Sequence, residues 1–153
     1  MRVWRVIAAA IVVLSVSLRA QQSELSAAAI SLALQESGTA TLYAVQFDAG
    51  PTIAKESERT LASIGEVLQS DGALDLEIRV YTPSAGASGE ALRLARARAA
   101  AIKTYLTDNL GIAPDRLTTA GAVQTRPVAA HAGAGGAPAQ NQNGRIELIK
   151  KNQ

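Results

Sequence analysis

The chain contains no cysteine among its 153 residues. This absence excludes disulfide bridges, thiolate metal sites, cysteine nucleophiles and a lipid-modified amino-terminal cysteine. Histidine occurs once, as His131, so a catalytic triad built on histidine would need that residue. His131 lies in the small-residue stretch Ala129–Gly136, and we interpret it as a solvated surface residue rather than a general base.

Motifs for phosphate or metal binding are also lacking. The glycines of Gly133–Gly136 are not followed by the Lys-Ser or Lys-Thr ending of a phosphate-binding loop. Scattered carboxylates such as Asp48, Glu56 and Glu58 are more typical of helix starts than of a metal site. We therefore expect no enzyme, no catalytic residue, no cofactor and no metal.

The amino terminus has the layout of a secretory signal. Arg2 and Arg5 precede the uncharged run Val6–Leu18, which is shorter than the roughly 20 residues of a membrane-spanning helix. We expect cleavage after Ala20. Leu18 is larger than the small residue preferred near such a cleavage site, so an uncleaved segment in contact with the membrane is the alternative.

Cleavage would change the charge of the protein. The formal net charge of +2 comes from 15 basic and 13 acidic residues. Loss of Arg2, Arg5 and Arg19 leaves 12 basic residues and a net charge of −1. A nucleic-acid partner, which requires a basic surface on the folded domain, is therefore not expected.

Hydrophobic periodicity predicts one domain of interleaved helices and strands. The clearest element is Leu74–Val80, where apolar residues alternate with Asp75, Glu77 and Arg79, so that one face is covered and the other is wet. The passage His131–Gly144 has no periodicity and is expected to be mobile. The other expected strands are Thr41–Phe47, Leu117–Gly121 and Arg145–Ile149, and the expected helices are Ser23–Gln35, Ala54–Gln69 and Glu90–Leu106. This order predicts an α/β (α+β) sandwich, a small mixed β-sheet with helices packed on one face.

One arginine interrupts the apolar stripe of the expected helix Glu90–Leu106. At about 100° per residue, Ala91, Leu94, Ile102 and Tyr105 lie within about 40° of Arg98, which places Arg98 in the middle of the stripe. A buried guanidinium stays charged and needs an anionic partner. That partner is either an internal acid or a ligand. A third interpretation is that the aliphatic stem of Arg98 packs on the core while its guanidinium reaches water.

These residues resemble the OmpA-like carboxy-terminal domain family. The resemblance spans Leu42–Lys150 and implies a periplasmic domain that tethers outer-membrane components to peptidoglycan. In this family an aspartate after a His-Thr pair and a helix arginine hold the diaminopimelate of the stem peptide. The matching segments, in order, are Phe47-Asp48, Lys55–Leu68, Val80–Thr82, Leu94–Leu106, Gly111–Leu117 and Asn143–Leu148.

The resemblance implies a ligand site that is only partly kept. Arg98, Thr82, Asn143 and Arg145 match the family and are the expected peptidoglycan-binding residues. The positions that depart are Tyr81 for the histidine, Pro83 for the ligand aspartate, Ala91 for an asparagine, Ala95 for a serine and Gly144 for an arginine. Because proline offers no charge and no amide donor, the site is expected to attract a carboxylate and to lack the partner for the amine.

The resemblance therefore implies a non-enzymatic envelope protein, located in the periplasm or associated with the outer membrane. It would associate weakly with peptidoglycan through Arg98. The alternative is a structural or interaction protein that keeps the fold, has lost peptidoglycan binding, as Pro83 favours, and contacts another cell-envelope protein. The expected organisation is a signal peptide (1–20), an amino-terminal helix and lead-in (21–40), the OmpA-like domain (41–150) and a tail (151–153).

Overall fold

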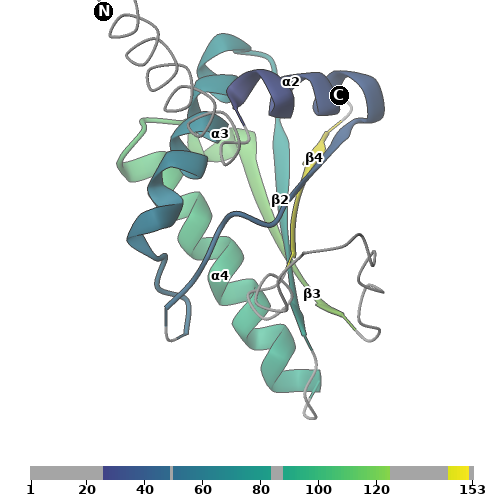
Figure 1. Ribbon diagram of the computed structural model, residues 1–153, viewed down its shortest axis with the longest axis vertical. Helices are drawn as coiled ribbons and strands as arrows, with labels where there is room; N and C mark the ends of the chain where they lie inside the picture. Colours follow the sequence, from purple (N-terminus) through teal and green to yellow (C-terminus); the bar gives the residue numbers. More distant parts are fainter. Residues whose placement is uncertain (1–25, 49, 84–87, 125–144, 152–153) are drawn as a thin grey trace, which may run out of the picture.

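The computed structural model describes residues 26–48, 50–83, 88–124 and 145–151. The expected signal peptide, His131 and the passage to Gly144, including Asn143, lie outside these residues. The described part contains helices on one side of a sheet (Figure 1). The helices are α2 (Ala27–Ser37), α3 (Glu58–Ser70) and α4 (Ser88–Asp108), and the strands are β1 (Thr39–Leu42), β2 (Leu76–Pro83), β3 (Leu117–Gln124) and β4 (Arg145–Lys150). Short 3₁₀ turns, Lys55–Ser57 and Pro114–Arg116, precede α3 and β3.

The sheet is mixed, with strand order β1-β4-β2-β3. β2 and β3 run parallel, and α4 forms the crossover between them, as a parallel pair requires. β4 is antiparallel to both of its neighbours. Residues from all three helices and all four strands form one hydrophobic core. The predicted mixed sheet with helices packed on one face is therefore confirmed.

Strand β2 has the facing that its alternation predicts. Leu76, Ile78 and Val80 are fully buried beneath the helices. Glu77 and Arg79 are half-buried on the other face, where they form an ion pair of 2.6 Å. β2 therefore forms the centre of the core and has a polar outer face.

The predicted strand Thr41–Phe47 is wrong in its bounds. β1 covers Thr39–Leu42, and the chain then leaves the sheet. The backbone N–H of Gln46 bonds to Ser57 Oγ at 2.7 Å, and Phe47 forms an isolated bridge with Ile53. Since these backbone groups have partners near α3, they do not extend the ladder with β4. Tyr43, just after β1, is 43% exposed.

The remaining boundaries shift by a few residues. The expected strand Leu74–Val80 is observed as β2, which begins at Leu76 and continues through Thr82 and Pro83. The expected helix Ala54–Gln69 begins as a 3₁₀ turn before α3. Gly38 ends α2 in the left-handed conformation, at φ 70°. None of the helices in the described ranges is long and apolar enough to span a membrane.

Candidate functional site

Arg98 lies on α4 at the margin of the buried stripe, and its residue is 8% exposed. The prediction that it occupies the middle of the stripe is wrong, because that middle lies about 70° away around the helix. Four side chains on α4 are fully buried and define the stripe: Ala95, Ala99, Ile102 and Leu106. Arg98 instead points toward the turn that follows β1.

Among the described residues, the guanidinium of Arg98 has backbone and aromatic contacts but no acidic partner. Its Nε donates a hydrogen bond of 3.0 Å to the backbone oxygen of Gly50. Its central carbon lies 4.7 Å from the centre of the Phe47 ring, within cation–π range. Within the described residues, no carboxylate lies within 4.0 Å of Arg98. The internal salt bridge, one of the three alternatives, is therefore absent from that part of the chain.

Burial lowers the pKa of Arg98. Desolvation disfavours the charged form, yet a guanidinium still keeps its proton at neutral pH. A positive charge at a mostly buried position, with no acid beside it in the described ranges, can accept an anion from outside. A carboxylate suits it best, because the guanidinium can donate two parallel hydrogen bonds to its two oxygens.

The turn beside Arg98 is fixed by its own hydrogen bonds. Asp48 N–H donates to Thr52 O at 2.9 Å, and Gly50 has a φ of 76°, which favours glycine. The fully buried Ser57 side chain holds the entry to this turn, since its Oγ both accepts from and donates to the backbone of Gln46. The Gly50 carbonyl therefore meets Arg98 of α4 beside backbone groups that these hydrogen bonds hold.

Thr82 and Pro83 end β2 at the same side of the molecule as the start of α4 (Figure 1). Thr82 is 6% exposed, lies on the helix-covered face and has a buried hydroxyl with no hydrogen-bond partner. Pro83 is half-buried and pairs in register with Gln124. Thr82 thus offers an unused donor and acceptor on the face that α4 covers.

Ala91 and Ala95 lie on α4, and Ala95 belongs to its buried stripe. The backbone at Ala95 and Arg96 lies so close to Gly121 of β3 that a Cβ there would be 2.6 Å from Arg96 N. This close approach sets the position of α4 over β3, and with it the position of Arg98.

Arg145 and Tyr81 come together on the opposite face of the sheet. The Arg145 guanidinium carbon lies 4.1 Å from the centre of the Tyr81 ring, and its Nη2 pairs with Glu147 at 3.1 Å. Tyr81 donates its hydroxyl to Glu147 at 2.9 Å. The structure therefore separates this pair from Thr82 and Arg98 by the thickness of the sheet.

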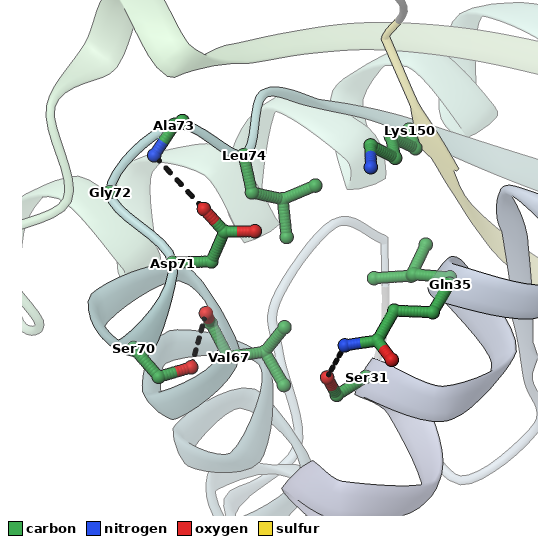
Figure 2. A pocket seen from close by; sticks show the side chains of 10 residues that line it. Ser31, Gln35, Val67, Ser70, Asp71, Gly72, Ala73, Leu74 and Lys150 are labelled. Atoms are coloured by element: carbon green, nitrogen blue, oxygen red, sulfur yellow. Dashed lines mark hydrogen bonds between the residues drawn. The ribbon is translucent and has the colours of Figure 1, made fainter.

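A cavity at the other end of the sheet was missed by sequence reasoning. It lies between α2, the end of α3 and the end of β4 (Figure 2). Three segments that are distant in sequence line it, 31–35, 67–74 and Lys150, so no local motif marks it. In the described part of the chain, no group of three or more His, Cys, Asp or Glu residues is placed to hold a metal ion.

Residues 46–141, which include Thr82, Pro83 and Arg98, match the model of the OmpA family. The chain belongs to the OmpA family. Domains of this family in its structural neighbours are binding or structural modules, and this OmpA-family chain is likewise not an enzyme. The match begins after β1 and ends before β4, so α2, β1 and β4 lie outside it.

Solved structures and a curated sequence also resemble this OmpA-family chain. The peptidoglycan-associated lipoprotein from Burkholderia pseudomallei is 25% identical, with a TM-score of 0.56 over 70% of this chain and 88% of the other. The cell wall anchor of the T6SS from Pseudomonas aeruginosa, 18% identical, shares the fold with a TM-score of 0.55 over 86% of this chain and 100% of the other. Photosystem I P700 chlorophyll a apoprotein A2 from Gloeobacter violaceus is 30% identical over 105 residues, 67% of this chain. The chain spans 12% of that protein's length.

Proposed function

We propose that the chain is a periplasmic envelope protein that binds the stem peptides of peptidoglycan weakly through Arg98. The observation that carries this proposal is the Arg98 guanidinium, mostly buried at the family's ligand position and without an acid among the described residues. Membership of the OmpA family and the likeness to a peptidoglycan-associated lipoprotein support the choice of ligand.

Arg98 would receive the carboxylate of diaminopimelate. The unpartnered Thr82 hydroxyl is enclosed in this structure, so it would give a second hydrogen bond only after a movement of the groups that cover it. The ammonium of the same ligand needs an acceptor with negative charge. Pro83 stands where the family has its aspartate and supplies none. Weak binding follows, because one of the two charges of the ligand loses its water without gaining an ion pair.

The amino-terminal sequence supports the proposed location. The charged start and the short apolar run favour removal of residues 1–20, and a mature chain in the periplasm that begins at Gln21. The OmpA-like domain, 41–150, would then form most of the mature protein. Arg145 and Asn143 remain proposed ligand residues by resemblance, although Arg145 points to the outer face of the sheet.

Sedimentation with purified peptidoglycan tests the proposal. We expect the native chain to sediment in part, Arg98→Ala to remain largely in the supernatant, and Arg93→Ala to behave as native. Arg93 is a matched control, because it lies on the same helix with its side chain exposed. Circular dichroism verifies that each variant is folded. Native sedimentation that does not depend on Arg98 would reject the proposed site.

A second candidate function, interaction with another envelope protein, is favoured by a different observation. Pro83 stands at the position of the family's ligand aspartate, which favours a protein that keeps the fold and contacts another envelope protein instead. Absence of sedimentation for the native chain, with the fold intact, would support this second function.

A further inference from the structure

A cavity of 520 Å³ lies between α2, the carboxyl end of α3 and the end of β4. It is remote from Arg98 and Thr82: the strand from Leu76 to Thr82 alone spans about 20 Å, and the cavity lies beyond the Leu76 end. Two of the elements that form it, α2 and β4, are outside the segment that matches the OmpA family. The cavity is therefore separate from the proposed peptidoglycan site.

The floor of the cavity is apolar. Leu34 from α2, Val67 from α3 and Leu74 before β2 line it, and all three side chains belong to the buried core. The volume falls within the range of about 300–1,000 Å³ that is usual for small-molecule sites. Leu34, Val67 and Leu74 are each exposed by 5% or less, so the floor offers an apolar side chain of a ligand a small contact area.

Two side chains of opposite charge, Asp71 and Lys150, lie on different sides of this apolar floor. Figure 2 shows the Asp71 carboxylate on one side of Leu74 and the Lys150 ammonium on the other. Neither forms an ion pair with any of the described residues. One Asp71 oxygen accepts from Ala73 N–H at 3.1 Å, so the second oxygen remains available.

Polar groups from α2 complete the rim. The Gln35 amide nitrogen donates to Ser31 Oγ at 3.3 Å, and its carbonyl oxygen remains available to accept. The lining therefore offers hydrogen-bond acceptors from Asp71 and Gln35, and the ammonium of Lys150 is the one positively charged group among the lining residues. A purely anionic ligand would be repelled by Asp71, and a purely cationic one would be repelled by Lys150.

We propose that this cavity binds a short zwitterionic peptide with an apolar side chain. Its carboxylate would pair with Lys150, its ammonium with Asp71, and its side chain would cover Leu74 and Val67. This ligand class uses both charges and the apolar floor together, whereas every ligand with one charge leaves the other unpaired.

The dipeptide Ala-Leu is a suitable probe, titrated into the full chain with observation of backbone amides by NMR. We expect shifts confined to residues 31–35, 67–74 and 150, with a Kd of about 0.1–1 mM, since a small ligand gains limited energy per atom. N-acetyl-Ala-Leu, Ala-Leu-amide and Gly-Gly lack the ammonium, the carboxylate and the apolar side chain. Each should bind about 3- to 10-fold more weakly.

Variants locate the two charges. Lys150→Gln and Asp71→Asn should each weaken Ala-Leu binding about 3- to 10-fold, and the amide oxygen introduced by Asp71→Asn would keep the acceptor that Ala73 uses. Lys151→Gln is the matched control, an exposed lysine outside the cavity, and should bind as native does. Arg98→Ala should also bind Ala-Leu as native does, so this result is independent of peptidoglycan binding.

Three results would overturn the proposal. They are the absence of shifts at about 10 mM Ala-Leu, a concentration well above the expected Kd, equal binding of the four peptides, and shifts centred on Gly50 and Arg98. A response to Ala-Leu that both Lys150→Gln and Lys151→Gln leave unchanged would reject the proposed role of Lys150.

Discussion

Arg98 and Gly50 are 48 positions apart in the chain and are joined by a hydrogen bond of 3.0 Å from Nε to the backbone oxygen. The bond ties the middle of α4 to the turn that follows β1. It uses one nitrogen of the guanidinium in a structural role. The remaining nitrogens have no acidic partner among the described residues, so the same side chain can hold the turn and bind an anion.

The first prediction concerns the two faces of β2. Ile78→Ala should lower the free energy of unfolding by about 2–5 kcal/mol, because Ile78 is fully buried at the centre of the core. Glu77→Ala should lower it by less than about 1 kcal/mol, since its pair with Arg79 is partly exposed. Urea denaturation of both variants gives the comparison. Equal losses would contradict the facing of this strand.

Gly121 should not tolerate a side chain. A Cβ at this position would lie 2.6 Å from Arg96 N and 3.1 Å from the carbonyl carbon of Ala95, so α4 and β3 would have to separate. Gly121→Ala should destabilise the protein by about 1–3 kcal/mol. Gly72→Ala is the control: nothing lies within 4 Å of its Cβ position, and we expect less than about 1 kcal/mol. Thermal unfolding in which Gly72→Ala is less stable than Gly121→Ala would refute the close packing of α4.

Arg116 should act as a structural clamp. Its guanidinium donates to the backbone oxygens of Leu68, Asp71 and Leu74, at 3.0, 2.6 and 2.7 Å from Nη2. Arg116→Ala would leave these oxygens without that donor, and we expect a loss of about 2–4 kcal/mol. The exposed Arg93→Ala should stay within about 0.5 kcal/mol of native. Guanidinium chloride titration measures both, and similar midpoints for the two variants would disprove the clamp.

Cleavage of the expected signal peptide predicts a defined mass for the mature protein. Protein recovered from the cell envelope should have the intact mass of a chain that begins at Gln21, because the charged start and short apolar run are typical of a cleaved signal. Mass spectrometry gives the answer directly. A mass that retains residues 1–20, together with recovery in the membrane fraction, would replace the soluble mature form with the anchored alternative.

The parts of the fold that the sequence predicts correctly are those with strict periodicity. Leu76, Ile78 and Val80 alternate without exception, and the structure buries all three. The stretch after Leu42 also alternates, but Ser57, eleven positions after Gln46, bonds to the Gln46 backbone and turns the chain away from the sheet. A hydrogen bond between a side chain and the backbone of another segment cannot be predicted from local hydrophobic periodicity.

The candidate sites also differ in how far the sequence predicts them. Arg98 is visible in the sequence, because a charge near an apolar stripe breaks a pattern. Its contact with Gly50 and the absence of a neighbouring acid among the described residues are visible only in the structure. The cavity lined by Asp71 and Lys150 could not be predicted at all, because α2, the end of α3 and the end of β4 come together only in the folded chain.

The last prediction restores the charge that the proposed peptidoglycan site lacks. A hydrogen bond to a charged group contributes about 1.5–3 kcal/mol, which corresponds to about 10- to 100-fold in Kd. Pro83→Asp should therefore tighten binding of a diaminopimelate-containing peptide, by only part of that range because Tyr81, Ala91 and Ala95 also depart from the family pattern. The gain should vanish in Pro83→Asp/Arg98→Ala, since only a site with both charges holds both ends of the zwitterion. Calorimetric titration of the native and both variant proteins measures the Kd of each for this peptide. Tight native binding that Arg98→Ala leaves unchanged would contradict the partly kept site, whereas a failure of Pro83→Asp to improve binding would show that the end of β2 no longer faces the ligand.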